Sequence, residues 1–441
     1  MICKKAITKM HAIIIVVIVI VACVAATAYY MSIPTGPKVS EVKIGLLFPL
    51  TGGLAALGKV NLMAARLVID LINERGGVLG GAKVVPIVAD CKSEPDVAVS
   101  ECERLCTVEK VPIIVGTFGS TLSYAATTVA EKNHVLYYEF SAVADSITAR
   151  GYKYVIRACP TASMLIQKKM LFVDQYVLPI LSQKLGKPKA DIKIAIVYEN
   201  TEWGMSEMKP EKEYCEQHGL NLVAIEGYPS GTATLAPILL KLKNLGVDVL
   251  LATSYVTDSI LLMREAHEND VNFKLVIGSG GGMGVQEFVA GAGDDAAYVV
   301  SCAYLTGRMK LPNIDYYNNL WVQKYGIDPV FGECTPVHGT IHIPNMLVLF
   351  DAIERAKSVD PDAVREALLQ TDIKPGERPD LLGLGYKFDE KQQNIYGIDQ
   401  LAIQQWLYEN GKLKFKAIWP VEIAEAEPVC PAPAWSERLI P

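Results

Sequence analysis

Short apolar runs alternate with stretches of helical periodicity along most of the chain. Continuous runs rich in Val, Ile and Leu predict buried strands at residues 42–50, 83–89, 111–116 and 135–140. Between them, apolar residues recur at helical spacing, as Leu62, Ala65, Val68 and Ile72 do within 59–73, which ends at a Gly-Gly pair. Further helices are expected at 95–108 and 120–133. This alternation predicts a parallel sheet that is covered by helices on both faces.

The same rhythm begins again in the second half of the chain. Strands are expected at 192–198, 222–226, 247–252 and 273–278, with helices at 203–218, 232–245 and 259–269. A strand at 297–304, helices at 343–356 and 361–370, and β segments at 400–408 and 412–419 follow. The fold class is therefore predicted as α/β, with two doubly wound Rossmann-like lobes joined by a hinge that the chain crosses several times.

The order of these elements also predicts the boundaries of the lobes. We assign residues 41–158 and about 300–370 to an N-terminal lobe, and residues 159–299 and about 371–423 to a C-terminal lobe. Residues 424–441 are rich in proline and are expected to form an irregular tail.

The first forty residues differ from the rest. Lys4, Lys5 and Lys9 precede an unbroken apolar run over 12–26, which is the pattern of an export signal. The run is shorter than the roughly 20 residues that usually span a bilayer.

Within this apolar run, the stretch from Ile20 to Cys23 resembles a bacterial lipoprotein box, which predicts lipidation at Cys23. A chance cysteine and an uncleaved anchor helix remain alternatives, and residues 31–40 are predicted as a tether. Either anchor would place the protein outside the cytoplasm, periplasmic or on the outer face of the cytoplasmic membrane, and tethered to that membrane.

Composition narrows the function classes. The chain has 441 residues, of which 51% are hydrophobic and 20% charged, so a large globular core is expected. The formal net charge is −6 and no long basic run occurs, which argues against a nucleic-acid partner. The glycine run at 278–282 does not fit G-x-G-x-x-G, and no Walker, G-x-S-x-G or H-E-x-x-H motif is present. We therefore expect a protein that is not an enzyme and holds no cofactor.

The spacing of the cysteine and histidine residues leads us to consider a disulfide and a zinc site. Cys91 with Cys102 or Cys106 is the local disulfide worth testing, although buried thiols explain these residues equally well. Cys334, His338 and His342 are spaced by four, as zinc ligands on one helix face can be. Nearby prolines make the helix doubtful, and three ligands do not close a structural site, so no metal is predicted.

The residues directly after the predicted strands are rich in glycine, hydroxyl and aromatic side chains. Ligands of open α/β sheets bind at the carboxyl ends of the strands. Hydroxyls and free amides at helix starts suit an anion such as a carboxylate, although the same residues also serve as ordinary caps. Six loops with this character favour a cleft between the lobes: 51–52, 117–121, 141–145, 200–203, 254–255 and 279–282.

At this point the chain resembles the periplasmic solute-binding proteins that serve ABC importers of branched-chain amino acids and amides. The resemblance spans nearly all of the chain after the leader, and its motifs stand in the family's order. They read KIGLLFPLTGGLAALGK, INERGGVLGG with VVPIVADCKSEPDVAV, IIVGTFGSTLSYAA, EFSAVADSITARGYKYVIRACP, IAIVYENTEWG and YKFDEKQQN. The resemblance implies a type I periplasmic binding protein whose partners are a small solute, an ABC permease and its ATPase.

The resemblance also implies roles for individual residues. Ser120 and Thr121 would hold a ligand carboxylate, and Ser141, Ala142 and Val143 would complete that pocket. From the other lobe, the residues expected to close over the ligand or line its site are Trp203, Tyr255, Ser279 and Gly280. Leu57 would touch the apolar part of the ligand.

One position departs from the family pattern. Amino-acid binders of this family commonly carry a glutamate after the strand at 273–278, where it pairs with the ligand's ammonium, and Gly280 stands there in this chain. Another acid could substitute, the candidates being Asp258, Glu202, Glu139 and Asp145. The other interpretation is that the ligand has no α-ammonium, because an unpaired buried ammonium is costly. We therefore expect an extracytoplasmic receptor for an amino acid, amide or small carboxylate, with a ligand-sensing receptor of the same fold as the alternative.

Overall fold

The computed structural model describes residues 14–23 and 40–438 and divides the chain into two units, Met1–Ser40 and Glu41–Pro441. In the first unit, residues 14–23 are helical and their apolar side chains are exposed. The predicted lysine-rich start and the tether up to residue 39 lie outside the described residues. Within the described part of the chain, no helix has both the length and the apolar character needed to cross a membrane.

The first lobe is built on a five-stranded parallel sheet in the order β2-β1-β3-β4-β5. Its strands are β1 (Glu41–Phe48), β2 (Lys83–Asp90), β3 (Ile113–Gly116), β4 (Leu136–Glu139) and β5 (Val155–Arg157). Leu46 faces one apolar cluster and Leu47 the other, so the sheet is buried on both faces, as the continuous apolar runs predict.

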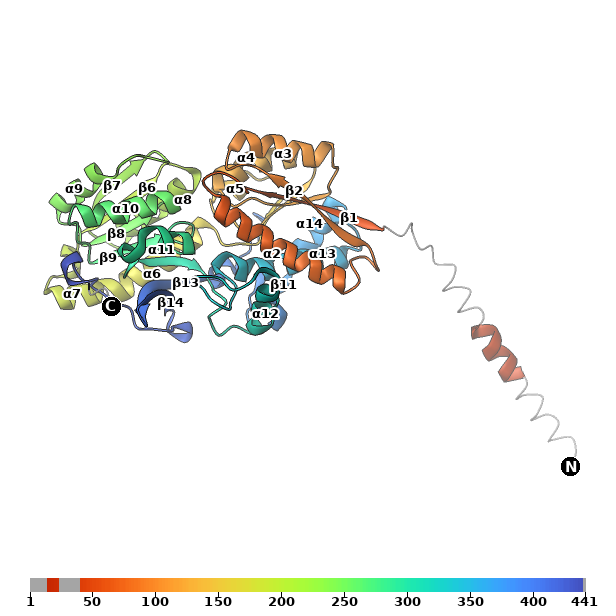
Figure 1. Cartoon of the computed structure of the whole chain (residues 1–441). Coiled ribbons are helices and arrows are strands. Elements are labelled where there is room, and N and C mark those ends of the chain that lie inside the picture. The colour runs from red at the N-terminus through yellow and green to blue at the C-terminus, as the bar shows by residue number, and fades with distance from the viewer. Residues whose placement is uncertain (1–13, 24–39, 439–441) are drawn as a thin grey trace, which may run out of the picture. The chain divides into compact units, whose positions relative to one another are not determined.

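Helices cover both faces of this sheet (Figure 1). They are α2 (Ala55–Glu74), α3 (Pro95–Thr107), α4 (Ser120–Lys132), the short α5 (Ser146–Ala149) and, from later in the chain, α12 (Ile314–Tyr325), α13 (Val337–Ala356) and α14 (Pro361–Leu369). Helices α3 and α4 pack together on one face, and α2 packs against α13 on the other. A two-stranded sheet of β11 (Asp372–Ile373) and β12 (Tyr386–Lys387) follows α14.

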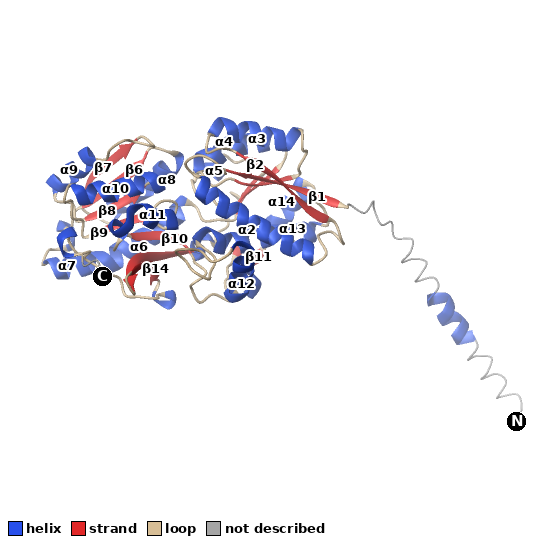
Figure 2. Cartoon of the chain, in the orientation of Figure 1, coloured by secondary structure: helices blue, strands red, loops and turns tan. Residues whose placement is uncertain are grey.

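The second lobe contains a seven-stranded sheet in the order β14-β13-β10-β9-β8-β6-β7. Its strands are β6 (Ile194–Glu199), β7 (Leu222–Tyr228), β8 (Val249–Thr253), β9 (Leu275–Ser279), β10 (Val300–Tyr304), β13 (Leu401–Glu409) and β14 (Lys412–Trp419). Neighbours are parallel from β7 to β10, and β13 and β14 add antiparallel strands. The strands of this lobe lie among its helices (Figure 2). The helices of this lobe are α6 (Ala162–Phe172), α7 (Leu178–Leu185), α8 (Glu202–Gln217), α9 (Ala236–Leu245), α10 (Val256–Glu268) and α11 (Gln286–Ala292). The prediction of two doubly wound lobes is confirmed.

The chain passes between the two sheets after β5, after β10 and before β13, which forms the hinge. Asn345 of α13 lies at this junction. Its side-chain amide donates to the Phe140 carbonyl at 3.3 Å, and its side-chain oxygen accepts from the Tyr386 hydroxyl at 2.7 Å and from Gln400 at 3.3 Å. Segments that are far apart in sequence are therefore joined by one fully buried amide.

Two details differ from the sequence expectations. Strand β10 was expected to begin the return to the first lobe at about residue 300, but it lies in the seven-stranded sheet. Helix α13 was expected from residue 343, yet it begins at Val337 and continues through Pro344. All of its first turns are buried, so tertiary packing stabilises a helix that its proline disfavours.

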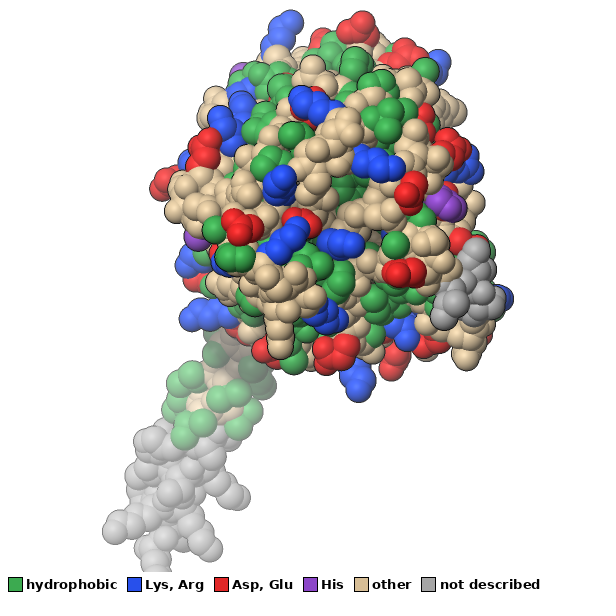
Figure 3. Space-filling view, turned by 90° about the vertical axis from the view of Figure 1, so that its left-hand side faces the viewer, with side chains coloured by type: hydrophobic (Ala, Val, Ile, Leu, Met, Phe, Trp, Pro, Cys, Tyr) green, Lys and Arg blue, Asp and Glu red, His purple; other side chains and the backbone are tan. Residues whose placement is uncertain are grey.

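The outer surface of the second lobe carries both signs of charge. On the face drawn in Figure 3, basic and acidic side chains are interspersed, which is ordinary for a soluble domain. The tail expected to be irregular forms only short 3-10 turns over its described part. It packs on this lobe through Trp435, whose indole donates to the Val271 carbonyl at 2.9 Å.

A buried cluster of charges lies between α6 and α8. The Lys169 ammonium contacts Glu207 at 3.3 Å and Glu211 at 2.8 Å, and all three side chains are fully buried. Burial raises the pKa of Glu211, and the nearby lysine opposes this effect. One ammonium thus offsets the cost of burying two carboxyl groups.

Lys169→Met should destabilise the protein by about 3–5 kcal/mol at pH 7, because two buried carboxylates lose their cation. A carboxyl group whose folded pKa is raised stabilises the fold below its unfolded pKa, and this contribution is lost as pH rises. The deficit should therefore shrink between pH 7 and pH 5, measured by urea unfolding. Lys212→Met, which breaks an exposed pair with Glu216 on the same helix, is the control and should cost under about 0.5 kcal/mol. Equal losses in the two variants would contradict this account.

Candidate functional site

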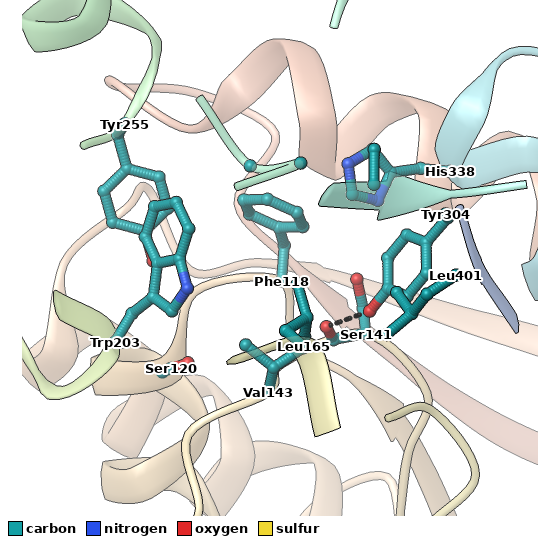
Figure 4. A pocket seen from close by; sticks show the side chains of 13 residues that line it. Phe118, Ser120, Ser141, Val143, Leu165, Trp203, Tyr255, Tyr304, His338 and Leu401 are labelled. Atoms are coloured by element: carbon teal, nitrogen blue, oxygen red, sulfur yellow. Dashed lines mark hydrogen bonds between the residues drawn. The ribbon is translucent and has the colours of Figure 1, made fainter. Parts of the chain in front are cut away.

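A cavity lies where the carboxyl ends of the two sheets face each other. About 390 Å³ of space, open solvent included, lies among its lining atoms, and about 30 Å³ of it has room for the centres of water-sized molecules. The residues that line it follow β3, β4, β6, β8 and β9, end β10, or belong to α6, α13 and the start of β13: Phe118, Ser120, Ser141, Val143, Leu165, Trp203, Tyr255, Gly280, Gly281, Ala303, Tyr304, His338 and Leu401. Figure 4 shows Trp203 and Tyr255 on one side and Tyr304 and His338 on the other, with Phe118 between them.

The first lobe supplies two buried hydroxyl groups. The Ser120 hydroxyl accepts a hydrogen bond from the Ala144 amide at 3.2 Å, and the Ser141 hydroxyl accepts one from Asn61 at 3.0 Å. Each hydroxyl therefore keeps its own hydrogen for a further acceptor. Ser120 also begins α4, whose N-terminus has no side-chain cap, so the positive end of the helix dipole faces this region.

The second lobe supplies aromatic surface. The rings of Trp203 and Tyr255 have centroids 4.5 Å apart, and Tyr255 also lies 6.2 Å from Phe118 of the first lobe. The indole N–H of Trp203 donates to Glu207 at 2.5 Å, so the buried charge cluster orients this ring. An added Cβ at Gly281 would lie 3.1 Å from the Trp203 ring, so glycine permits this close approach.

The crossing segments close the far wall. The Tyr304 hydroxyl donates to the Ser141 carbonyl at 3.0 Å, which ties β10 to the first lobe. The imidazole of His338 stands edge-on to Phe118 and to Tyr304, each with ring centroids 5.2 Å away. Burial lowers the pKa of His338 to about 3, so the ring is neutral at pH 7.

None of the residues that line the cavity carries an ionised side chain at neutral pH. Three buried acids bond to lining residues, and one of them, Glu199, accepts from the Tyr255 amide at 3.0 Å. Glu139 accepts hydrogen bonds from the amides of Ser141 and Ala142 and from the Ser123 hydroxyl, and burial raises its pKa to about 8. Glu207 accepts from Trp203, Ser279, Thr253 and Lys169. The cavity therefore suits an apolar body and a group that accepts hydrogen bonds.

The two acids proposed as ammonium partners lie elsewhere. Glu202 accepts from the Ser146 hydroxyl at 2.9 Å, a contact that links α8 to α5 of the first lobe. Asp258 accepts from the Gly231 amide at 3.3 Å and lines a neighbouring pocket, which shares Tyr255 with the cavity and which we call the outer pocket. At Gly280, an added Cβ would lie 3.1 Å from Ala303, so a side chain there requires Ala303 to shift.

The structure brings together six of the ten ligand-binding residues expected from the sequence. These are Ser120, Ser141, Val143, Trp203, Tyr255 and Gly280. The other four lie outside the cavity. Leu57 lines a neighbouring pocket and Thr121 the outer one. The Ala142 amide and the Ser279 hydroxyl donate to buried glutamates.

Sequence reasoning missed Phe118, Tyr304 and His338 as lining residues. Phe118 lies inside the loop that was considered, and Tyr304 ends a predicted strand, so the rule on strand ends could have found both. His338 was weighed only as a zinc ligand. Across residues 14–23 and 40–438 no group of three possible ligands can hold a metal ion. Cys91, Cys102 and Cys106 are buried free thiols.

The sequence of the chain matches a known family and known proteins. The family model described as "Periplasmic binding protein" matches residues 41–411. The "Leu/Ile/Val-binding protein homolog 7" of Brucella suis is 34% identical over 381 residues, covering 86% of this chain and 91% of that protein.

Two solved structures share the fold. The branched-chain amino acid transporter substrate-binding protein of Streptococcus pneumoniae, in complex with isoleucine, superimposes with a TM-score of 0.69 at 21% identity and covers 86% of this chain and 99% of its own. An ABC transporter solute-binding protein of Rhodopseudomonas palustris, in complex with 3,4-dihydroxybenzoic acid, has a TM-score of 0.69 at 20% identity and covers 86% and 97%.

Ser120→Ala should weaken the binding of a small carboxylic acid by about 1–2 kcal/mol, since one hydrogen bond to a charged group is removed. Calorimetry with the tightest acid available measures the change. Ser100→Ala, on the exposed side of α3, is the control and should bind like the wild type. An unchanged affinity in Ser120→Ala would remove this hydroxyl from the ligand site.

Proposed function

We propose, from the premise that the chain belongs to the periplasmic binding protein family, that it captures a small amphipathic carboxylate outside the cytoplasm and delivers it to an ABC importer. Its two lobes close around the solute, and the permease with its ATPase receives it. The observation that carries the proposal is the cavity between the facing strand ends, which combines hydroxyl donors with aromatic walls.

A carboxylate is the favoured polar group of the ligand. The hydroxyls of Ser120 and Ser141 keep hydrogens to donate, and the N-terminus of α4 adds positive potential. An apolar or aromatic body would fill the space between Trp203, Tyr255 and Phe118.

The absence of a charged lining argues against an α-ammonium. An ammonium in this cavity would lose its hydration without gaining a carboxylate partner, which is costly. A bound amino acid is the second candidate, because the relatives of Brucella are named Leu/Ile/Val-binding protein homologues. In that case Asp258 or Glu202 would have to move toward the ligand. The complex of the Rhodopseudomonas palustris protein with an aromatic acid is consistent with the first candidate.

The N-terminal segment supports export and tethering. The apolar side chains from Ile14 to Val21 are between 49% and 61% exposed, so this helix offers a surface suited to a membrane or to a signal peptidase. We propose that Cys23 becomes the lipidated N-terminus of the mature protein and holds the binding lobes at the outer face of the cytoplasmic membrane.

A panel of paired ligands tests the ligand class. Leucine and phenylalanine are compared with their deaminated counterparts, 4-methylpentanoate and 3-phenylpropanoate, by calorimetry and thermal shift. The acids should bind at least about tenfold more tightly, because only the amino acids bury an unpaired ammonium. A bound acid at 100 times its Kd should add roughly 2.7 kcal/mol to the free energy of unfolding.

Micromolar binding of the amino acids with none of the acids would contradict the carboxylate proposal. Asp258→Asn and Glu202→Gln, measured on the same panel, would then identify the acid that pairs with the ammonium. If neither variant loses affinity, another group must play that role.

Cys23→Ser should move the protein from the membrane fraction to the soluble extracytoplasmic fraction, because it removes the lipidated thiol. Cell fractionation with immunoblotting measures this distribution, and Cys3→Ser, in the same leader, is the matched control. Unchanged membrane association of Cys23→Ser would favour an uncleaved anchor helix over a lipoprotein.

A further inference from the structure

The wall of the cavity contains a polar side chain neither of whose polar atoms has a hydrogen-bond partner within the described part of the chain. Both ring nitrogens of His338 are buried and have no hydrogen-bond partner among the described residues. Buried polar groups in native proteins are nearly always paired, so an exception at a cavity wall indicates a partner that arrives with the ligand.

The ring of His338 is fixed by its neighbours. Phe118 and Tyr304 hold it edge to face, at interplanar angles of 83° and 84°. Its residue is the second of α13, which packs against α2 of the first lobe. On its other side it borders a smaller pocket lined by Leu57, Val60 and Val285, so it stands between two apolar spaces.

Other polar groups on this wall are already engaged. The Tyr304 hydroxyl donates to the Ser141 carbonyl, and the Ser141 amide donates to Glu139. His342, one turn further along α13, also has unpartnered ring nitrogens, but it stacks on Phe140 at 4.4 Å and does not line the cavity. On the wall formed by Tyr304 and α13, His338 is therefore the side chain whose ring nitrogens are available to hydrogen-bond the ligand.

The hydrogen-bonding chemistry of the His338 imidazole indicates which ligand group it binds. A neutral imidazole presents one N–H donor and one nitrogen acceptor, and a hydroxyl group is the small substituent that both donates and accepts. A fixed charge is a poorer match, because no counterion lines this wall.

We propose that His338 is a specificity-determining residue that hydrogen-bonds a hydroxyl on the apolar body of the ligand. This inference rests on the proposed function and extends it from small carboxylates to hydroxylated ones. The site then holds a solute whose carboxylate is bound by the Ser120 hydroxyl and whose hydroxyl is bound by His338. A ligand without the hydroxyl leaves the imidazole unpaired and binds less well.

Benzoate, 3-hydroxybenzoate and 4-hydroxybenzoate, which differ only in one hydroxyl, test the proposal by calorimetry on the full chain. At least one hydroxybenzoate should bind the wild type roughly three- to tenfold more tightly than benzoate, the range for one added neutral hydrogen bond. In His338→Phe, which keeps an aromatic ring, this preference should disappear while benzoate still binds. A merely structural role would weaken all three ligands alike.

His342→Phe makes the same replacement one turn away and should retain the preference. His338→Leu repeats the test if the phenylalanine variant does not fold. The inference is overturned if the wild type binds carboxylic acids without preferring the hydroxylated ones, or if the preference survives in the His338 variant; either result leaves the proposed function intact. Failure of the wild type to bind these acids and those of the amino-acid panel would overturn the proposed ligand class, and this inference with it.

Discussion

The constraint on which the site depends is that parallel strands all end at the same edge of their sheet. In each lobe this edge collects the starts of several helices, with their free amides and small polar residues. The crossings after β5, after β10 and before β13 hold the two edges facing each other, and the buried Asn345 amide joins the segments at that junction. The strand ends and helix starts of the two sheets are therefore sufficient to form a cavity between the lobes.

Buried charged side chains outside the lining hold the walls of this cavity in position. Glu139 accepts the amides that hold the loop of Ser141, and Glu207 orients Trp203 and the Ser279 hydroxyl. Both acids are fully buried, and Lys169 offsets the charge of the second one. The polar residues nearest the site thus fix the positions of its walls, whereas the walls themselves are neutral. Because the buried acids bond to the walls and do not line the cavity, the cavity disfavours an ammonium although acids lie nearby.

Two polar groups of the proposed ligand are recognised by different means. Serine hydroxyls and a helix N-terminus favour a carboxylate, and the neutral ring of His338 suits a hydroxyl. The aromatic rings between them select by shape and apolar area. At Gly280, an added Cβ would lie 3.1 Å from Ala303, so an acidic side chain at this position requires Ala303 to shift.

The sequence by itself determined the alternation of strands and helices, the two-lobed α/β class and most of the loops that line the site, because burial on both faces of a sheet leaves continuous apolar runs and glycine-rich strand ends. It did not place β10 or the start of α13, since sheet membership and a helix through Pro344 depend on packing between distant segments. Tertiary structure alone decided that Ala142 and Ser279 serve buried glutamates while His338 reaches the cavity. Those outcomes depend on side-chain directions and, for Ser279, on a partner 72 residues away, which local sequence patterns do not encode.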